Sequence, residues 1–447
     1  MDSSSLLCYL KFSILPKHGQ DCGVTDVIFH AACLLMSYSE PRPFFPGWLF
    51  LLAMMTALSP LSVDLYLPAF PTIASDLGVQ SADVQITLAV FLFGMSVGQL
   101  VYGPLSDRYG RKPPLYFGLA LFLLASFGCM LATDLATLTV ARFFQALGGS
   151  AGVVVSRAVI RDRTTTAQAA WAFSMLMLAL GLAPILAPVA GSLLLKVMGW
   201  REIFAILGIA GTILLLAVHF NMHETLSRHT AERLGVAGTF KRYADLFRDR
   251  QFIMYVLIIA LPFGAMFAYV AGAPYVIIEL YEVPAVHFGW LFGLNAFGMI
   301  AGSQLNARVV ARFGPAALLN AILWPPFLAA LVALTATLAG YASLPLLMAC
   351  FFVYMFSMGM LSPNAVALAM ASQGHRAGSA SAVIGAVQFL FGTLGAVAVS
   401  VWVMPSAIPL TGVMVIMLGT SLLIHHFGHR HNILILHGSD IEPSALK

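Results

Sequence analysis

The sequence predicts an all-α membrane protein with twelve transmembrane helices arranged as two six-helix halves. Apolar residues make up 60% of the 447-residue chain and charged residues only 9%, and the mean hydropathy is +0.89. Soluble domains carry about 25% charged residues, so this chain has too few polar groups to cover a surface in water. The net charge of +4 is spread over short loops and does not indicate a nucleic-acid partner. The five cysteines show neither a disulfide framework nor the spacing of a metal site.

Twelve apolar stretches are each about long enough to cross a hydrocarbon core of ~30 Å. Each must be helical in lipid, because an open strand would leave backbone polar groups unpaired. The spans are expected at 46–68, 84–102, 114–133, 135–156, 169–195, 202–222, 252–278, 287–305, 315–338, 343–365, 378–402 and 405–427.

Basic residues concentrate in alternate loops. If the N-terminus is cytoplasmic, most Lys and Arg fall in inner loops, whereas the outer loops hold only Lys196 and Arg201. Because cytoplasmic loops carry the excess of Lys and Arg, both termini are expected in the cytoplasm.

The longest internal polar stretch, 223–250, divides the spans six and six. It predicts an N-terminal bundle at 46–222, a linker, a C-terminal bundle at 251–427 and a cytoplasmic tail at 428–447. A degenerate copy of the 103–112 segment, running from Gly302 to Gly314, follows span eight as the original follows span two. Two parallel six-helix halves are typical of secondary transporters.

The N-terminal tail, 1–45, does not fit the pattern of spans. Its first 35 residues contain no usable span and no convincing signal peptide. We interpret Met36 as the true start and the residues before it as a misassigned beginning; the alternative is a genuine disordered tail.

The most specific motif is Gly103-Pro-Leu-Ser-Asp-Arg-Tyr-Gly-Arg-Lys112, between spans two and three. Gly103 and Gly110 are expected to allow tight turning. Asp107 can accept hydrogen bonds from the first N–H groups of a neighbouring helix. The basic residues can hold lipid headgroups, helix C-termini or Asp107 itself. We expect these residues to latch the cytoplasmic side; the alternative is a loop that only fixes topology. The latch residues are Gly103, Asp107, Arg108, Gly110, Arg111 and Lys112.

A second pair, Asp64 in span one and Arg142 in span four, places charges inside the membrane. Such charges are costly and indicate a functional site. Both residues are expected in the outer half of the N-terminal bundle, with Arg142 as the partner of Asp64. A buried carboxylate without a cation beside it takes up a proton, so proton and substrate can compete for Asp64. The alternatives are an interfacial Asp64 at a helix end and a structural tie made by Arg142.

The 103–112 segment resembles the signature loop of the major facilitator superfamily. Arg142-Phe-Phe-Gln-Ala-Leu-Gly-Gly is similar to its R-x-x-Q-G motif, with Ala146 at the usual Gly. Span five, Gly181-Leu-Ala-Pro-Ile-Leu-Ala-Pro-Val-Ala-Gly191, is similar to its antiporter motif, with Ala187 at the first Gly. Four further segments make residues 45–427 similar to the Bcr/CflA branch of bacterial drug:proton antiporters; they are 64–68, 269–274, 287–295 and 378–382.

The resemblance implies the major facilitator fold, a bacterial inner-membrane location, and export of drugs in exchange for protons. It implies that Gly181, Pro184, Pro188 and Gly191 seal the contact between the halves, although generic small-residue packing explains the same residues. The partners expected are small-molecule substrates, protons and the lipid bilayer, with the chain as a monomer. No cofactor is expected beyond the proton gradient, since the sequence contains no Walker A motif.

Aromatic and polar residues on the spans that line the central cavity in the resembling fold are candidate substrate contacts. They are Tyr66, Phe91, Phe93, Gln145, Phe263, Tyr269, Trp290, Asn295, Phe297, Gln388 and Phe391. The five histidines of the C-terminal segment indicate a solvated basic end rather than a metal site, because no acid or cysteine cluster accompanies them. The rival functions are an exporter of a metabolite such as a sugar, amino acid or nucleobase and, least favoured, an intramembrane enzyme.

Overall fold

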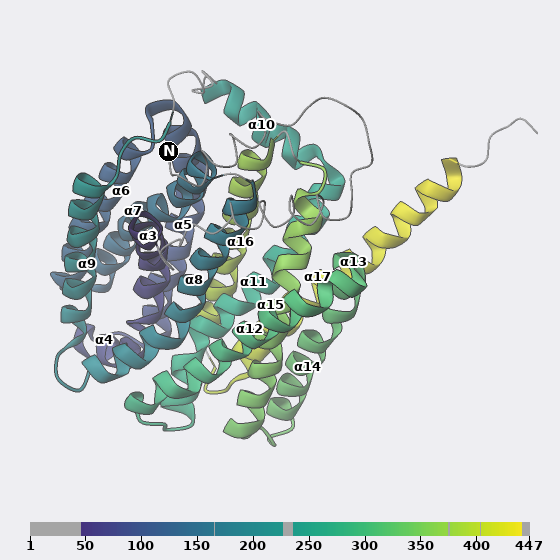
Figure 1. Ribbon diagram of the computed structural model, residues 1–447. Helices are drawn as coiled ribbons and strands as arrows, with labels where there is room; N and C mark the ends of the chain where they lie inside the picture. The colour runs from purple at the N-terminus through teal and green to yellow at the C-terminus, as the bar shows by residue number, and fades with distance from the viewer. Residues whose placement is uncertain (1–45, 165, 227–235, 374–375, 403, 440–447) are drawn as a thin grey trace, which may run out of the picture. The chain divides into compact units, whose positions relative to one another are not determined.

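The computed structural model describes residues 46–164, 166–226, 236–373, 376–402 and 404–439 (Figure 1). Helices and turns, without any strand, make up this described part of the chain. The N-terminal segment 1–45, with the expected start at Met36, lies outside it, as do residues 440–447.

The first six spans are built from seven α-helices and one short 3-10 helix. These elements are α3 (Gly47–Asp64), η1 (Leu67–Ala69), α4 (Phe70–Leu77), α5 (Ser81–Tyr109), α6 (Lys112–Met130), α7 (Leu135–Arg163), α8 (Thr166–Leu194) and α9 (Trp200–Asn221).

The linker and the last six spans follow. They comprise α10 (Val236–Arg248), α11 (Arg250–Pro274), the π-helical turn η2 (Tyr275–Leu280), α12 (Ala285–Phe313), α13 (Pro315–Ile322), α14 (Trp324–Leu338), α15 (Leu344–Met370), α16 (Ala377–Val401) and α17 (Ile408–Ser439).

Eleven segments of the described residues are long and apolar enough to cross a membrane. The twelfth predicted span is α8, a 29-residue helix whose apolar stretch, Leu180–Leu194, is shorter. The all-α prediction and its order of spans are therefore confirmed.

Side-chain caps set several helix boundaries. The carboxylate of Asp134 accepts a hydrogen bond from the Thr137 backbone N–H at 2.8 Å at the start of α7. Asp249 does the same for Phe252 at 3.0 Å at the start of α11. These acceptors satisfy N–H groups that have no partner within the helix. At the other kind of end, α4 stops at Gly78, whose positive φ of 64° favours glycine.

Three segments differ from the simple pattern of spans. Span one is broken after Asp64 and continues through η1 and α4, because Pro68 has no backbone N–H to donate to the Asp64 carbonyl four residues earlier. Span nine is divided between α13 and α14 at Leu323, just before two prolines. The last helix, α17, runs to Ser439, beyond the span end expected at 427.

The two halves meet along two pairs of helices. In Figure 1 the first six spans (purple to teal) lie on one side and the last six (green to yellow) on the other. Helix α5 packs against α16, and α8 packs against α12. We call the end of the bundle that carries the α5–α6 turn the basic end. The other end, which carries the turns at 131–134 and 281–284, is the opposite end.

The linker contains more structure than its polar composition indicates. Its second part forms α10, which packs against α11 and α16 at the basic end. Tyr243 and Leu246 are buried in this contact. The Tyr243 hydroxyl also donates a hydrogen bond to the Leu100 carbonyl oxygen of α5 at 3.2 Å. Thus α10 touches both halves.

Candidate functional site

Arg142 is fully buried in the first half, between two aromatic rings. Its guanidinium carbon lies 4.2 Å from the ring centroids of both Tyr66 and Phe91. Its Nη1 donates hydrogen bonds to the Ser62 carbonyl oxygen at 3.0 Å and to the Gln145 side chain at 2.6 Å. The electron-rich ring faces and these two acceptors stabilise a cation that water does not reach.

Asp64 is the last residue of α3, at the break in span one, and is 5% exposed. Its expected pairing with Arg142 is not formed: the salt bridges of the described residues do not include this pair. The guanidinium instead keeps two buried donors, Nε and Nη2, without a hydrogen-bond partner in the described part of the chain. Asp64 does end α3, as the interfacial alternative expects, but its side chain is buried in the bundle.

A second buried polar pair lies in the other half. The Asn295 side-chain amide of α12 donates to the Tyr269 hydroxyl of α11 at 2.8 Å. Tyr269 in turn stacks on Phe292, with ring centroids 5.4 Å apart and planes at 11°. Because η1 packs against both α11 and α12, the broken part of span one adjoins this pair.

The other residues predicted to line the cavity differ in exposure and in contacts. Trp290 is 65% exposed, and Phe93 and Phe297 are also exposed. Trp290 and Phe297 are seven residues apart and therefore share one face of α12. Tyr66 and Phe91 pack on Arg142 instead of lining a cavity. Gln388, Phe263 and Phe391 are half-buried, whereas the Gln145 amide donates to Ser126 at 2.8 Å.

At the basic end, Arg111 is 1% exposed and joins three elements. Its Nε and Nη2 donate to the Asp162 carboxylate of α7 at 2.8 and 3.3 Å. Its Nη1 donates to Asp107 at 2.6 Å and to Ser106 at 3.0 Å. Burial lowers the pKa of Arg111, but the two carboxylates outweigh it and leave the pKa above its ordinary value.

Glu224, just after α9, holds the turn itself. Its carboxylate accepts hydrogen bonds from the backbone N–H groups of Arg111 at 2.8 Å and Lys112 at 3.1 Å, at the start of α6. It also accepts from the N–H groups of Thr225 and Leu226, each at 3.0 Å. Partial burial raises the pKa of Glu224, but these backbone donors outweigh it and leave the pKa below its ordinary value. The negative charge also suits a helix N-terminus.

The ten-residue loop expected between spans two and three is mostly helix. Helix α5 runs to Tyr109 and α6 starts at Lys112, so only Gly110 and Arg111 turn. Gly110 has a φ of 95°, and a Cβ there would lie 2.6 Å from the Glu224 carboxylate. Gly103, in contrast, lies inside helix α5 with no atom within 4 Å of where its Cβ would be, so its expected part in the turn was wrong.

The charged residues of the segment have separate partners. Asp107, 57% exposed, pairs with Arg111 and, at 3.9 Å, with Arg161. Arg108 and Lys112 lie over the rings of Tyr109 and Tyr116, with 5.3 and 5.6 Å to the ring centroids.

Span five meets both halves through small residues. Gly191 packs so closely on the break after α3 that a Cβ there would collide with the Leu65 carbonyl oxygen. On the other side, a Cβ on Gly289 of α12 would lie 2.6 Å from the Pro188 carbonyl oxygen, and Ser192 accepts a hydrogen bond from the Gly289 N–H at 3.2 Å. Gly181 has only ordinary contacts, with Ile300 at 3.5 Å. Despite Pro184 and Pro188, α8 is one continuous helix.

Comparison with known proteins gives one consistent result. The family profile described as Major Facilitator Superfamily matches residues 52–396. The chain belongs to the Major Facilitator Superfamily. It is 39% identical to the uncharacterized MFS-type transporter YdgK of Bacillus subtilis, over 77% of this chain and 86% of the relative. It is 31% identical to a bicyclomycin resistance protein homolog of Haemophilus influenzae, over 84% and 94% of the two chains. The latter supports the Bcr/CflA-type branch indicated by the motifs.

The fold agrees with solved structures of the superfamily. A bacterial homolog of the human lysosomal transporter Spinster, in an inward-facing and occupied conformation, superimposes with a TM-score of 0.66. The match covers 88% of this chain and 98% of that one at 16% sequence identity. The protein is therefore a multi-pass membrane transporter of the major facilitator fold.

The internal repeat expected for this superfamily is visible at the turns. Helices α5 and α12 have the same length, 29 residues, and end directly before Gly110 and Gly314, with φ values of 95° and 75°. Counting back twelve residues from each turn reaches Gly98 and Gly302, and a Cβ on either would collide with a neighbouring helix. The counterpart of Gly302 is therefore Gly98 and not Gly103.

Sequence reasoning missed two acidic residues, Asp162 and Glu224. Asp162 lies between Arg161 and Arg163, so the cluster reads as a basic loop, and Glu224 lies at the start of the polar linker. The sequence did offer one clue. Each is the first acidic residue after a span, four or six, that ends on the same side of the membrane as the 103–112 segment. Metal-type clusters are absent among the described residues; His429, His431 and His437 have no described side chains.

Proposed function

We propose that this transporter exports small drug-like molecules in exchange for protons, with Asp64 as the group that binds the proton. The observation that carries the proposal is a buried carboxylate at the break of span one, two residues after the Ser62 carbonyl that binds Arg142. Arg142 keeps two buried donors without a hydrogen-bond partner in the described part of the chain. A charged side chain inside a span is costly and is retained where it has a function. The resistance named for the Haemophilus relative supports drugs as the substrate class.

In this mechanism Asp64 alternates between two states. Protonated, it tolerates burial without a charged partner. When it loses the proton, the unused Nε and Nη2 donors of Arg142, or a cationic substrate, stabilise the carboxylate. Proton and substrate then compete for one group, which couples their opposite movements. Alternating access follows from movement of the two halves around this centre.

The orientation and surroundings belong to the same proposal. The excess of Arg and Lys at the basic end supports a cytoplasmic position for that end, in a bacterial inner membrane. Both termini then lie on the cytoplasmic side of the inner membrane. The proton gradient supplies the energy without a cofactor, and the monomer moves its substrates unchanged, with no enzymatic step and no nucleic acid as a partner.

The test is proton flux in proteoliposomes challenged with a panel of antibiotics and other organic compounds. Asp64→Asn should reduce substrate-induced proton flux to the background of empty vesicles, because the amide cannot exchange a proton. Asp76→Asn, which changes an exposed acid of the same span, should retain flux. Wild-type flux in Asp64→Asn would remove Asp64 from the mechanism.

The same panel separates the rival substrate class. Sugars, amino acids and nucleobases belong in it, because a metabolite exporter would use the same fold and the same coupling residue. Flux induced by these compounds and by no drug would replace drug export with metabolite export.

A further inference from the structure

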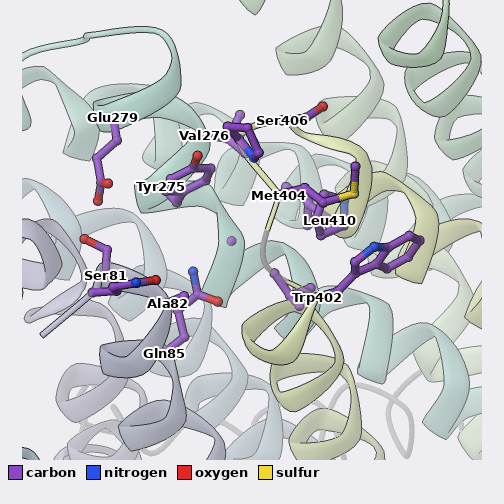
Figure 2. Close-up of a pocket in the computed structure, with 15 residues that line it drawn as sticks. Ser81, Ala82, Gln85, Tyr275, Val276, Glu279, Trp402, Met404, Ser406 and Leu410 are labelled. Carbon is purple, nitrogen blue, oxygen red and sulfur yellow. The ribbon is translucent and has the colours of Figure 1, made fainter.

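A cavity of about 380 Å³ opens at the opposite end of the bundle, and its lining includes neither Asp64 nor Arg142 nor any residue of the 103–112 segment. One wall is the start of α5, in the first half. The remaining walls come from α11, η2, α16, the connection after α16 and the start of α17, in the second half (Figure 2). The cavity therefore exists only while these parts of the two halves stand this close.

Its polar groups favour a cationic hydrogen-bond donor. Gln85 is 3% exposed, its Oε1 has no hydrogen-bond partner in the described part of the chain, and it faces the cavity in Figure 2. A buried acceptor without a donor is costly, so a ligand N–H at this position gains a hydrogen bond at no competing loss. Glu279 supplies a carboxylate on the other side. The fifteen lining residues include no Lys, Arg or His to balance that charge.

Apolar and aromatic side chains form much of its remaining surface, beside Gln80, Ser81 and Ser406. Val276, Leu410 and Met404 line it, and the Trp402 indole stands at one edge. An aromatic face attracts a cation, and an apolar wall with a few convergent polar groups is typical of a small-molecule site.

We propose that this cavity is a second binding site, for aromatic organic cations that carry N–H donors, with Gln85 accepting from the donor and Glu279 balancing the charge. Such a ligand touches both halves, so it binds the conformation with this end closed together. The proposal requires neither proton coupling nor a direction of transport.

The first experiment measures equilibrium binding of ethidium, an aromatic cation with amino groups, to the full-length protein in nanodiscs. Glu279→Gln should weaken binding about twofold to fivefold, the range of an exposed ion pair. Glu282→Gln is the matched control, since it removes an exposed carboxylate three residues away that does not line the cavity. Equal affinity in wild type and both variants, or no binding to wild type, would overturn the proposal.

The second experiment isolates Gln85. Gln85→Met keeps the length of the side chain but removes the acceptor, and should weaken ethidium about twofold to tenfold. Tetraphenylphosphonium, a cation without N–H donors, should bind wild type and Gln85→Met equally. An equal loss for both cations would indicate disturbed packing and count against the hydrogen bond.

The third experiment locates the bound molecule. Ser81 lines the cavity at the start of α5, and Ser81→Cys should react with a maleimide more slowly when ethidium is present. Asp64→Asn in the same background should keep this protection, so failure of the coupling mechanism and failure of this site are distinguishable. Unchanged labelling with ethidium bound would place the ligand elsewhere.

Discussion

At the scale of single residues, the signature segment depends on one glycine and one acid distant in sequence. Gly110 adopts a φ of 95° and a ψ of 171°, a region almost confined to glycine. The space where its Cβ would lie is taken by Glu224, which receives the backbone N–H groups of the next helix. The turn is therefore specified by the backbone conformation of Gly110 and by the cap from Glu224, which follows the last helix of the first half.

The two glycines of the signature should respond differently to alanine. Gly110→Ala forces a strained backbone and a collision, and is expected to destabilise the protein by about 1–3 kcal/mol. Gly103→Ala enters open space within a helix and should be neutral or stabilising by up to about 1 kcal/mol. Thermal unfolding of both variants in detergent checks this, and an equal loss in both would contradict it.

The lowered pKa of Glu224 predicts how acid affects the turn. A carboxyl whose pKa is lower in the folded protein stabilises the fold above its unfolded pKa, about 4.3 for glutamate. That stabilisation is lost as the pH falls through the lower folded value. Wild type should therefore be more stable than Glu224→Gln at pH 7, and the difference in melting temperature should shrink below about pH 4.3. A difference that stays constant down to pH 3 would mean that the charge of Glu224 does not contribute.

At the scale of elements, α8 is the helix that joins the broken first span to the second half. Gly191 lies on the Leu65 carbonyl, while Pro188 and Ser192 lie on Gly289 of α12. Small residues allow two backbones to approach closely in a membrane. A substitution that shifts α8 should therefore affect both the backbone beside Asp64 and the contact between the two halves.

Two glycines of α8 provide a matched test of that contact. Gly191→Ala requires the backbone at Leu65, in the break of span one, to move and should cost about 1–3 kcal/mol, as overpacking does, with slower transport. Gly181→Ala has only ordinary contact with Ile300 and should keep transport within about twofold. The assay is substrate-induced flux in proteoliposomes at equal protein density. If Gly181→Ala is the more damaging change, the close approach at Gly191 is not the important one.

At the scale of the whole molecule, the halves are held together by α5 with α16 and by α8 with α12. Toward the basic end, Ser96 donates to the Ala386 carbonyl at 2.8 Å, and Gln99 lies against Gly385. Helix α10 adds the contact from Tyr243 to Leu100. For access to alternate, the α5–α16 contact must open.

A disulfide across this contact should stop transport. In a Gln99→Cys/Gly385→Cys variant the two side chains are close enough to bridge, since a Cβ on Gly385 would lie 3.4 Å from the present Gln99 Cγ. Oxidation should reduce flux to background, and reduction should restore it. The two single-cysteine variants should be insensitive to oxidation. Full transport by the cross-linked protein would show that these helices need not separate.

The sequence by itself determined the twelve helical spans and their order. These features are local, because hydrocarbon forces each apolar stretch to satisfy its own backbone as a helix. Which side chains bind each other was harder to predict. Arg111 could be predicted to hold an acid, but its choice of Asp162 and the cap by Glu224 join positions 51 and 113 residues apart.

Tertiary structure alone decided which residues face the interior and which groups meet. It exposed Trp290, surrounded Arg142 with Tyr66 and Phe91, and left Asp64 without the expected ion pair. It also showed that Gly110, and not Gly103, makes the turn. The physical reason is that hydropathy fixes whether a helix lies in the membrane, whereas its rotation and neighbours depend on close packing between helices.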